Sequence, residues 1–132
     1  MNEHDIVNEW LEIAYEDYDD TAQYLFDNKC PKPLEIICYH CQQSAEKSLK
    51  AYICANDIEI SKTHEVGLLC RQCSELDDSF SHFQEDCEDL ELYATRTRYP
   101  GRIEIENNDA EKSLMQALKL YEFVSEKIQQ FV

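Results

Sequence analysis

The chain has 132 residues, of which 43% are hydrophobic, so we expect one domain over residues 1–132 with an ordinary core. Its 2 glycines and 3 prolines are too few for a turn-rich β-sandwich or barrel, which favours an all-α fold. The formal net charge of −16 excludes non-specific DNA binding, because a field of that sign repels phosphate backbones.

Apolar residues at helical spacing predict the first two helices. The first is expected over about residues 5–28, and the prolines that follow it break the chain. The second is expected over about residues 33–56, where Asn56 and Asp57 form a natural stop.

Three more helices are expected in the rest of the chain. Thr63 can cap the third, which carries apolar residues from 66 to 76, and a turn near residues 77–81 leads to the fourth. Pro100 and Gly101 end the fourth, and Asn107 or Asn108 is expected to cap the fifth, with an apolar stripe from 110 to 128. Because short connections make neighbouring helices antiparallel, we expect an up-and-down bundle of about five helices.

The sequence predicts a soluble, cytoplasmic protein without a membrane span. The first residues lack the basic and apolar regions of a secretion signal, and no apolar run reaches the length that a span requires. The seven cysteines are therefore expected to be reduced thiols. Two pairs, Cys38 with Cys41 and Cys70 with Cys73, have the inner spacing of a zinc site, but both lie on apolar helical stripes, where thiols act as small hydrophobes. We expect no metal and no cofactor.

One polar stripe of the second predicted helix combines groups that suit phosphate or carboxylate recognition. His40, Gln43, Lys47 and Lys50 are spaced 3, 4 and 3 residues apart, so they fall within about 80° of one another on a helix. An imidazole, an amide and two ammonium groups on one face can bind an anion. The alternative is a solvated face on which Glu46 pairs with Lys50.

Two further clusters gather the few cations of this acidic chain. Arg96, Arg98 and Arg102 lie with Tyr99 where a helix is expected to end, and guanidinium groups bind phosphate bidentately. Lys62 and His64 precede the third predicted helix, and helix N-termini attract anions. The alternatives are a C-terminal helix cap for the arginines and an exposed His64 beside the Thr63 cap.

Three motifs, in this order and at these separations, resemble the HEPN domain family. They are YHCQQSAEKSLKA at residues 39–51, KTHEV at 62–66 followed by Leu68 and Leu69, and TRYPG at 97–101. The resemblance covers the chain from about Trp10 to Ile128. It implies an all-α bundle that forms homodimers, a nucleotide-binding role, and in many cases a partner, a small nucleotidyltransferase, in a toxin–antitoxin-like pair.

Several branches of that family are metal-independent RNases with an Arg-x4-6-His motif, and this sequence departs from it. No histidine follows any arginine at the required distance, because the last histidine, His82, precedes three of the four arginines. Acid–base catalysis by a motif histidine is therefore unsupported. Only a spatial pairing, such as His40 or His64 with Arg98, could restore it.

The sequence thus favours a non-catalytic homodimer that binds a nucleotide or a related phosphate ligand. The residues expected to form the site are His40, Gln43, Lys47, Lys50, Lys62, His64, Arg96, Arg98 and Tyr99. Tyr99 could stack on a base. Two alternatives stay open: a metal-independent RNase of the toxin or defence type, and a module that only binds other proteins.

Overall fold

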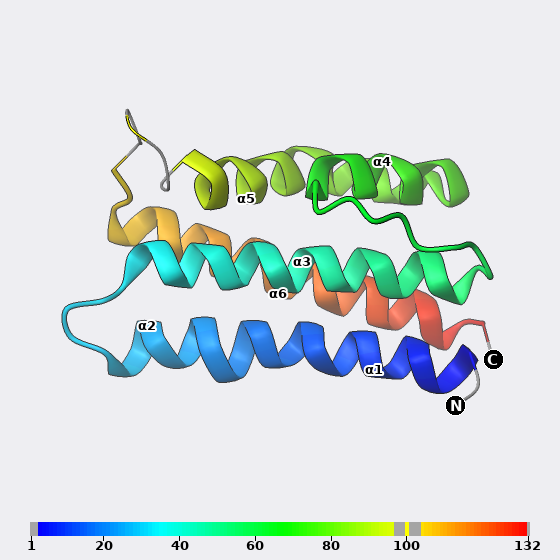
Figure 1. Ribbon diagram of the computed structural model, residues 1–132, viewed down its shortest axis with the longest axis horizontal. Coiled ribbons are helices and arrows are strands. Elements are labelled where there is room, and N and C mark those ends of the chain that lie inside the picture. The colour runs from blue at the N-terminus through cyan, green and yellow to red at the C-terminus, as the bar shows by residue number, and fades with distance from the viewer. Residues whose placement is uncertain (1–2, 97–99, 101–103, 132) are drawn as a thin grey trace.

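The computed structural model describes residues 3–96, 100 and 104–131, and this part of the chain is all-α, without strands. In chain order the elements are α1 (Glu3–Tyr15), η1 (Glu16–Gln23), α2 (Tyr24–Asn28), α3 (Leu34–Ala55), α4 (Val66–Leu76), η2 (Asp78–Phe83), α5 (Gln84–Arg96) and α6 (Asn107–Gln129). Figure 1 shows that the helices lie side by side along the long axis of the molecule. The predicted up-and-down bundle of about five helices is confirmed, with α1, η1 and α2 joined into the first rod.

The first rod contains an element that the apolar spacing does not reveal. Its middle, η1, is a π-helix, in which the backbone N–H of Tyr24 reaches back to the carbonyl of Asp19. The buried residues along the rod are Val7, Leu11, Ala14, Tyr18 and Ala22. The rod therefore keeps its apolar face on the core through the π segment, while its other faces carry acidic side chains.

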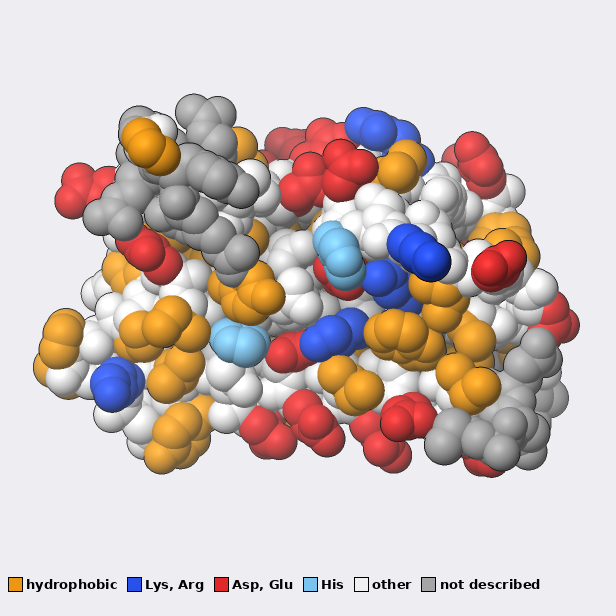
Figure 2. Space-filling view, viewed as in Figure 1, with side chains coloured by type: hydrophobic (Ala, Val, Ile, Leu, Met, Phe, Trp, Pro, Cys, Tyr) orange, Lys and Arg blue, Asp and Glu red, His pale blue; other side chains and the backbone are white. Residues whose placement is uncertain are grey.

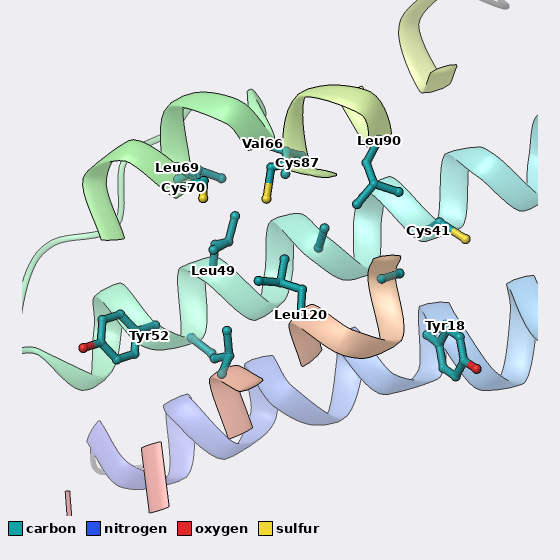
Figure 3. Packing of buried hydrophobic residues seen from close by; sticks show 14 of the residues in the cluster. Tyr18, Cys41, Leu49, Tyr52, Val66, Leu69, Cys70, Cys87, Leu90 and Leu120 are labelled. Atoms are coloured by element: carbon teal, nitrogen blue, oxygen red, sulfur yellow. The ribbon is translucent and has the colours of Figure 1, made fainter. Parts of the chain in front are cut away.

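Helix α3 is the centre of the molecule. It contacts each of the other α-helices, and in Figure 1 it runs between the first rod and the α4–α5 layer, with α6 behind it. Its buried side chains include Ile37, Leu49 and Ile53. Figure 3 shows Leu49 and Leu120 filling the space between α3 and its neighbours. Because so much of α3 is covered, most of its polar residues must find partners inside the protein.

The stop after α3 is confirmed, whereas two predicted helix caps are wrong. Asp57 takes a left-handed backbone (φ 60°) and donates to the carbonyl of Cys54, which closes the helix. Thr63 is not the cap of α4, because its Oγ1 accepts from the N–H of Glu65 in a tight turn, and α4 begins only at Val66. Asn107 and Asn108 lie inside α6, whose N-cap is Glu106.

None of the helices in the described part of the chain has the length and apolar character that crossing a membrane requires.

Candidate functional site

The polar stripe of α3 is not a free, solvated face. Figure 2 views the molecule from the side on which α3 lies in front. Histidine side chains and lysine or arginine side chains gather over the middle of this face, with carboxylates among them. Lys50 is only 6% exposed, so it does not face solvent as the sequence pattern predicts. The stripe is instead organised by two carboxylates, each of which contacts one histidine and one lysine.

Asp17 organises the first cluster. Its Oδ1 lies 3.1 Å from His40 Nδ1, and its Oδ2 lies 2.5 Å from Lys47 Nζ. Asp17 belongs to η1, so the π segment places this carboxylate against α3. The positive charge of Lys47 is thereby neutralised within the protein, and the imidazole of His40 is held in one orientation.

Glu46 organises the second cluster, and it is more deeply buried. Its Oε2 accepts from Lys50 Nζ at 3.0 Å and lies 3.1 Å from His64 Nδ1. The Glu46 side chain is 5% exposed whereas that of His64 is 78% exposed, so the imidazole covers the carboxylate from outside. Glu46 Oε1 is buried without a hydrogen-bond partner in the described part of the chain. The predicted Glu46–Lys50 pair is present.

A pocket of about 540 Å³ lies beside the second cluster. It is lined by Tyr39, Gln42 and Gln43 of α3, His64 and Glu65 of the loop before α4, and Glu91, Ala94 and Thr95 of α5. Two hydrogen bonds, which we call the amide relay, hold the glutamine side chains of the lining in place: Gln43 Nε2 donates to Gln42 Oε1, and Gln42 Nε2 donates to the carbonyl of His64. The pocket thus joins two of the residues that the sequence predicts, Gln43 and His64.

The remaining predicted site residues fall into two groups. Lys62 is exposed, two residues before His64, and it makes no ion pair within the described part of the chain. Arg98 and Tyr99, and the side chain of Arg96, lie outside the described residues. A second pocket, of about 550 Å³, lies where Lys32–Ile36 approach Glu104 and Ile105, and none of the predicted site residues lines it.

The four cysteines with zinc-like spacing belong to the core. Among the described residues, no group of three or more His, Cys, Asp or Glu is arranged to hold a metal ion. Burial raises the pKa of the Cys38, Cys41 and Cys73 thiols. Cys70 differs, because a hydrogen bond from the Cys87 thiol lowers its pKa, and the same bond raises that of Cys87.

Sequence reasoning missed several residues that the structure brings to this region. Tyr39 lies three residues before Gln42 and four before Gln43 on α3, so helical spacing could have found Tyr39 and Gln42. Asp17 and Glu91 come from other helices, and only the packing of the bundle reveals them.

The comparisons with known proteins agree with this architecture. The model of the HEPN domain family matches residues 7–128. The crystal structure of TT1696 from Thermus thermophilus is similar over 92% of this chain and 97% of that one, with a TM-score of 0.78 and 26% identity. The crystal structure of ST0689, an archaeal HEPN homologue, has the same coverage, with a TM-score of 0.72 and 23% identity. No curated protein matches the sequence significantly.

The family match spans most of the chain, and the fold and the motifs agree with it. The protein belongs to the HEPN domain family.

Proposed function

We propose that this HEPN protein binds a nucleotide, with the base and ribose in the pocket beside α3 and the phosphate at its rim. The observation that carries the proposal is the pocket, which brings Gln43 and His64 together with Tyr39. Its volume of about 540 Å³ lies within the usual range for small-molecule sites, roughly 300 to 1,000 Å³.

The inner wall of the pocket supports base recognition. Tyr39, whose ring meets that of His40 edge-on, lines the pocket, and every base can stack on an aromatic ring. The amides of Gln42 and Gln43 are fixed by their mutual hydrogen bond, so they present polar groups in a defined orientation. A flat base, which can contact both an aromatic ring and fixed amides, is the ligand class that this wall fits best.

The rim of the pocket supports phosphate recognition. His64 Nδ1 faces the Glu46 carboxylate, which leaves Nε2 for a ligand, and Lys62 lies two residues away in the same loop. Thr95 lines the pocket, and Arg96 and Arg98 follow it one and three residues later in the sequence. In this proposal these cations contact the phosphate, which stays outside because carboxylates line the interior.

Lys47 and Lys50 have a different role in this proposal from the one that the sequence pattern indicates. Each is paired with a carboxylate, Asp17 or Glu46, that also contacts a histidine. They stabilise the two carboxylates that orient His40 and His64, and they do not contact the phosphate themselves.

Calorimetric titration with ATP and with GTP, each with and without Mg²⁺, tests the proposal. We expect saturable binding that weakens about tenfold in His64→Ala and in Gln43→Ala, which is what losing one charge-assisted or polar contact costs. The control is Lys112→Ala, which removes an exposed lysine that pairs with Asp89 on the α5–α6 side. Absence of heat from a folded protein with millimolar ATP and also with millimolar GTP would refute nucleotide binding.

Self-association and a protein partner are part of the same proposal. We propose that the chain works as a homodimer and pairs with a small nucleotidyltransferase, as its family resemblance implies. Light scattering should then give twice the 15.6 kDa of one chain. Co-expression with a candidate nucleotidyltransferase should give a complex that survives gel filtration, and separate elution would argue against the partner.

One observation favours the RNase alternative enough to test it. His64 is held by a buried carboxylate, Glu46, which is how proteins orient a histidine that acts as a general base. An RNase would cleave RNA in EDTA and lose that activity in His64→Ala. Intact RNA after long incubation with the dimer would exclude this alternative.

A further inference from the structure

We infer that the pocket beside α3 selects guanine among the bases, with the Glu91 carboxylate accepting from the N1–H and the exocyclic N2 amino group. This inference rests on the proposed nucleotide binding and adds the identity of the base. Its basis is the set of acceptors that line the pocket, the fixed position of Glu91, and the donor pattern of each purine.

The pocket interior is rich in hydrogen-bond acceptors. Two carboxylates, Glu65 and Glu91, line it, and none of its described lining residues is a lysine or an arginine. In the amide relay Gln43 uses its nitrogen as a donor to Gln42, so its Oε1 is left as a further acceptor. A ligand edge that faces Glu91 must therefore bring N–H donors, since an acceptor edge there would meet carboxylate oxygens.

Glu91 is held in place by the first turn of α4. Its Oε1 accepts from the backbone N–H of Gly67 at 3.1 Å. A Cβ atom at position 67 would lie only 3.2 Å from Cγ of Glu88, so the glycine permits this close approach of α4 and α5. Glu91 thus presents its second oxygen, and the free lone pair of Oε1, without having to be ordered when a ligand binds.

Guanine is the purine whose edge matches a carboxylate. Its N1–H and N2 amino group are parallel donors that a carboxylate accepts with both oxygens, as it accepts from arginine. Hypoxanthine keeps the N1–H but lacks the amino group. Adenine has an unprotonated N1 beside its amino group, which a carboxylate repels. Tyr39 stacks on any purine, so the discrimination comes from Glu91.

Titration with GMP, IMP and AMP at equal ionic strength tests the inference. The three share ribose and phosphate, so any affinity common to them measures the proposed function, and differences measure base recognition. We expect GMP to bind at least about tenfold more tightly than IMP or AMP. Free arginine, which carries the same planar donor pattern, is titrated in parallel.

Two variants test whether the selectivity for guanine depends on the side chain of Glu91. In Glu91→Gln the amide oxygen takes over the contact with Gly67, and the amide nitrogen then faces the donors of guanine. We expect GMP binding to weaken about tenfold, whereas AMP binding should not weaken, because the amide no longer repels N1 of adenine. Glu88→Gln makes the same charge change on the same helix, outside the pocket lining, and should leave the GMP-to-AMP ratio unaltered. Melting temperatures of both variants show that they are folded.

The outcomes separate this inference from the proposed function. Equal binding of the three nucleotides would overturn guanine selectivity and leave nucleotide binding standing. Selectivity for GMP that persists in Glu91→Gln would overturn the role of Glu91. Binding of arginine without binding of any nucleotide would overturn both, because the pocket would then recognise a guanidinium group.

Discussion

Glu46 and Lys50 form the most deeply buried ion pair among the described residues, with 5% and 7% of their side chains exposed. Lys50 Nζ also lies 5.9 Å from the centre of the Trp10 ring. Removing both charges of a buried pair is often harmless, whereas removing one leaves an ion without its partner in a poorly solvated site. The stability of α3 should therefore depend on this pair being complete rather than on its being charged.

We predict that Lys50→Met lowers the free energy of unfolding by about 3 kcal/mol, because Glu46 then stays buried with only the exposed His64 beside it. The double variant Glu46→Met/Lys50→Met should recover most of this loss. Urea unfolding measures both. The control is Arg71→Met, which breaks an exposed pair with Glu88 and should cost less than about 1 kcal/mol. A double variant as unstable as Lys50→Met would contradict the argument.

Asp77 caps the C-terminal end of α4, and its carboxyl group should make the stability of the protein depend on pH. Hydrogen bonds from Lys127, and then from Ser79, lower the pKa of the Asp77 carboxyl from 3.8 to about 2. Because the pKa is lower in the folded state, its stabilisation is complete above pH 4 and disappears as the pH falls towards 2. We expect Asp77→Asn to have the lower melting temperature at pH 7. The difference should shrink below pH 4, and one that stays constant down to pH 2 would show that ionisation of Asp77 plays no part.

At the scale of elements, the π-helix η1 determines where Asp17 lies. Its wider turns fit an extra residue into the first rod, while Tyr18 and Ala22 still reach the core. The hydroxyl of Tyr18 also donates to Gln23 Oε1 at 3.2 Å, across the π segment. An α-helix over the same residues would carry Asp17 away from its present position against His40 and Lys47.

Deleting one exposed residue of η1, Asp20, should therefore be tolerated. The shorter segment can close as an α-helix with both flanking faces retained, so we expect a loss of no more than about 2 kcal/mol in urea unfolding. Deleting the exposed Glu122 from α6 is the control. It rotates the following turn by about 100° and removes Val124 and Ile128 from the core, so it should prevent stable folding. Equal damage from both deletions would refute the π-segment argument.

The sequence predicts a helix correctly where the residues that determine it are close together in the chain. Apolar spacing and the Asn56–Asp57 stop predict α3 correctly, and the spacing of Glu46 and Lys50 along one helix predicts their pair. The cap at Thr63 was wrong because a turn used the same hydroxyl. The contacts of His40 and Lys47 with Asp17 were not predictable, because they depend on how two helices pack and on a π segment that periodicity cannot show.

At the scale of the whole molecule, the excess of acidic residues opposes the compact state. Residues 1–28 hold nine acids and no lysine or arginine, and residues 72–95 also lack lysine and arginine. The internal ion pairs use some of the few cations, such as Lys47 and Lys50, to stabilise single carboxylates. The remaining negative charge acts over the whole surface, and dissolved salt screens it over distances of about 10 Å at 0.1 M.

The melting temperature should therefore rise by several degrees between about 0.02 and 0.5 M NaCl, measured by calorimetry or circular dichroism. The double variant Glu16→Gln/Asp20→Asn removes two exposed acids of η1 and should melt higher than the parent at low salt. Lys119→Gln makes the net charge more negative at an exposed position of α6 and should melt lower. Both differences should shrink at 0.5 M, because screening acts on the same repulsion. A melting temperature that does not change with salt, in parent and variants alike, would show that self-repulsion contributes nothing to the stability of this fold.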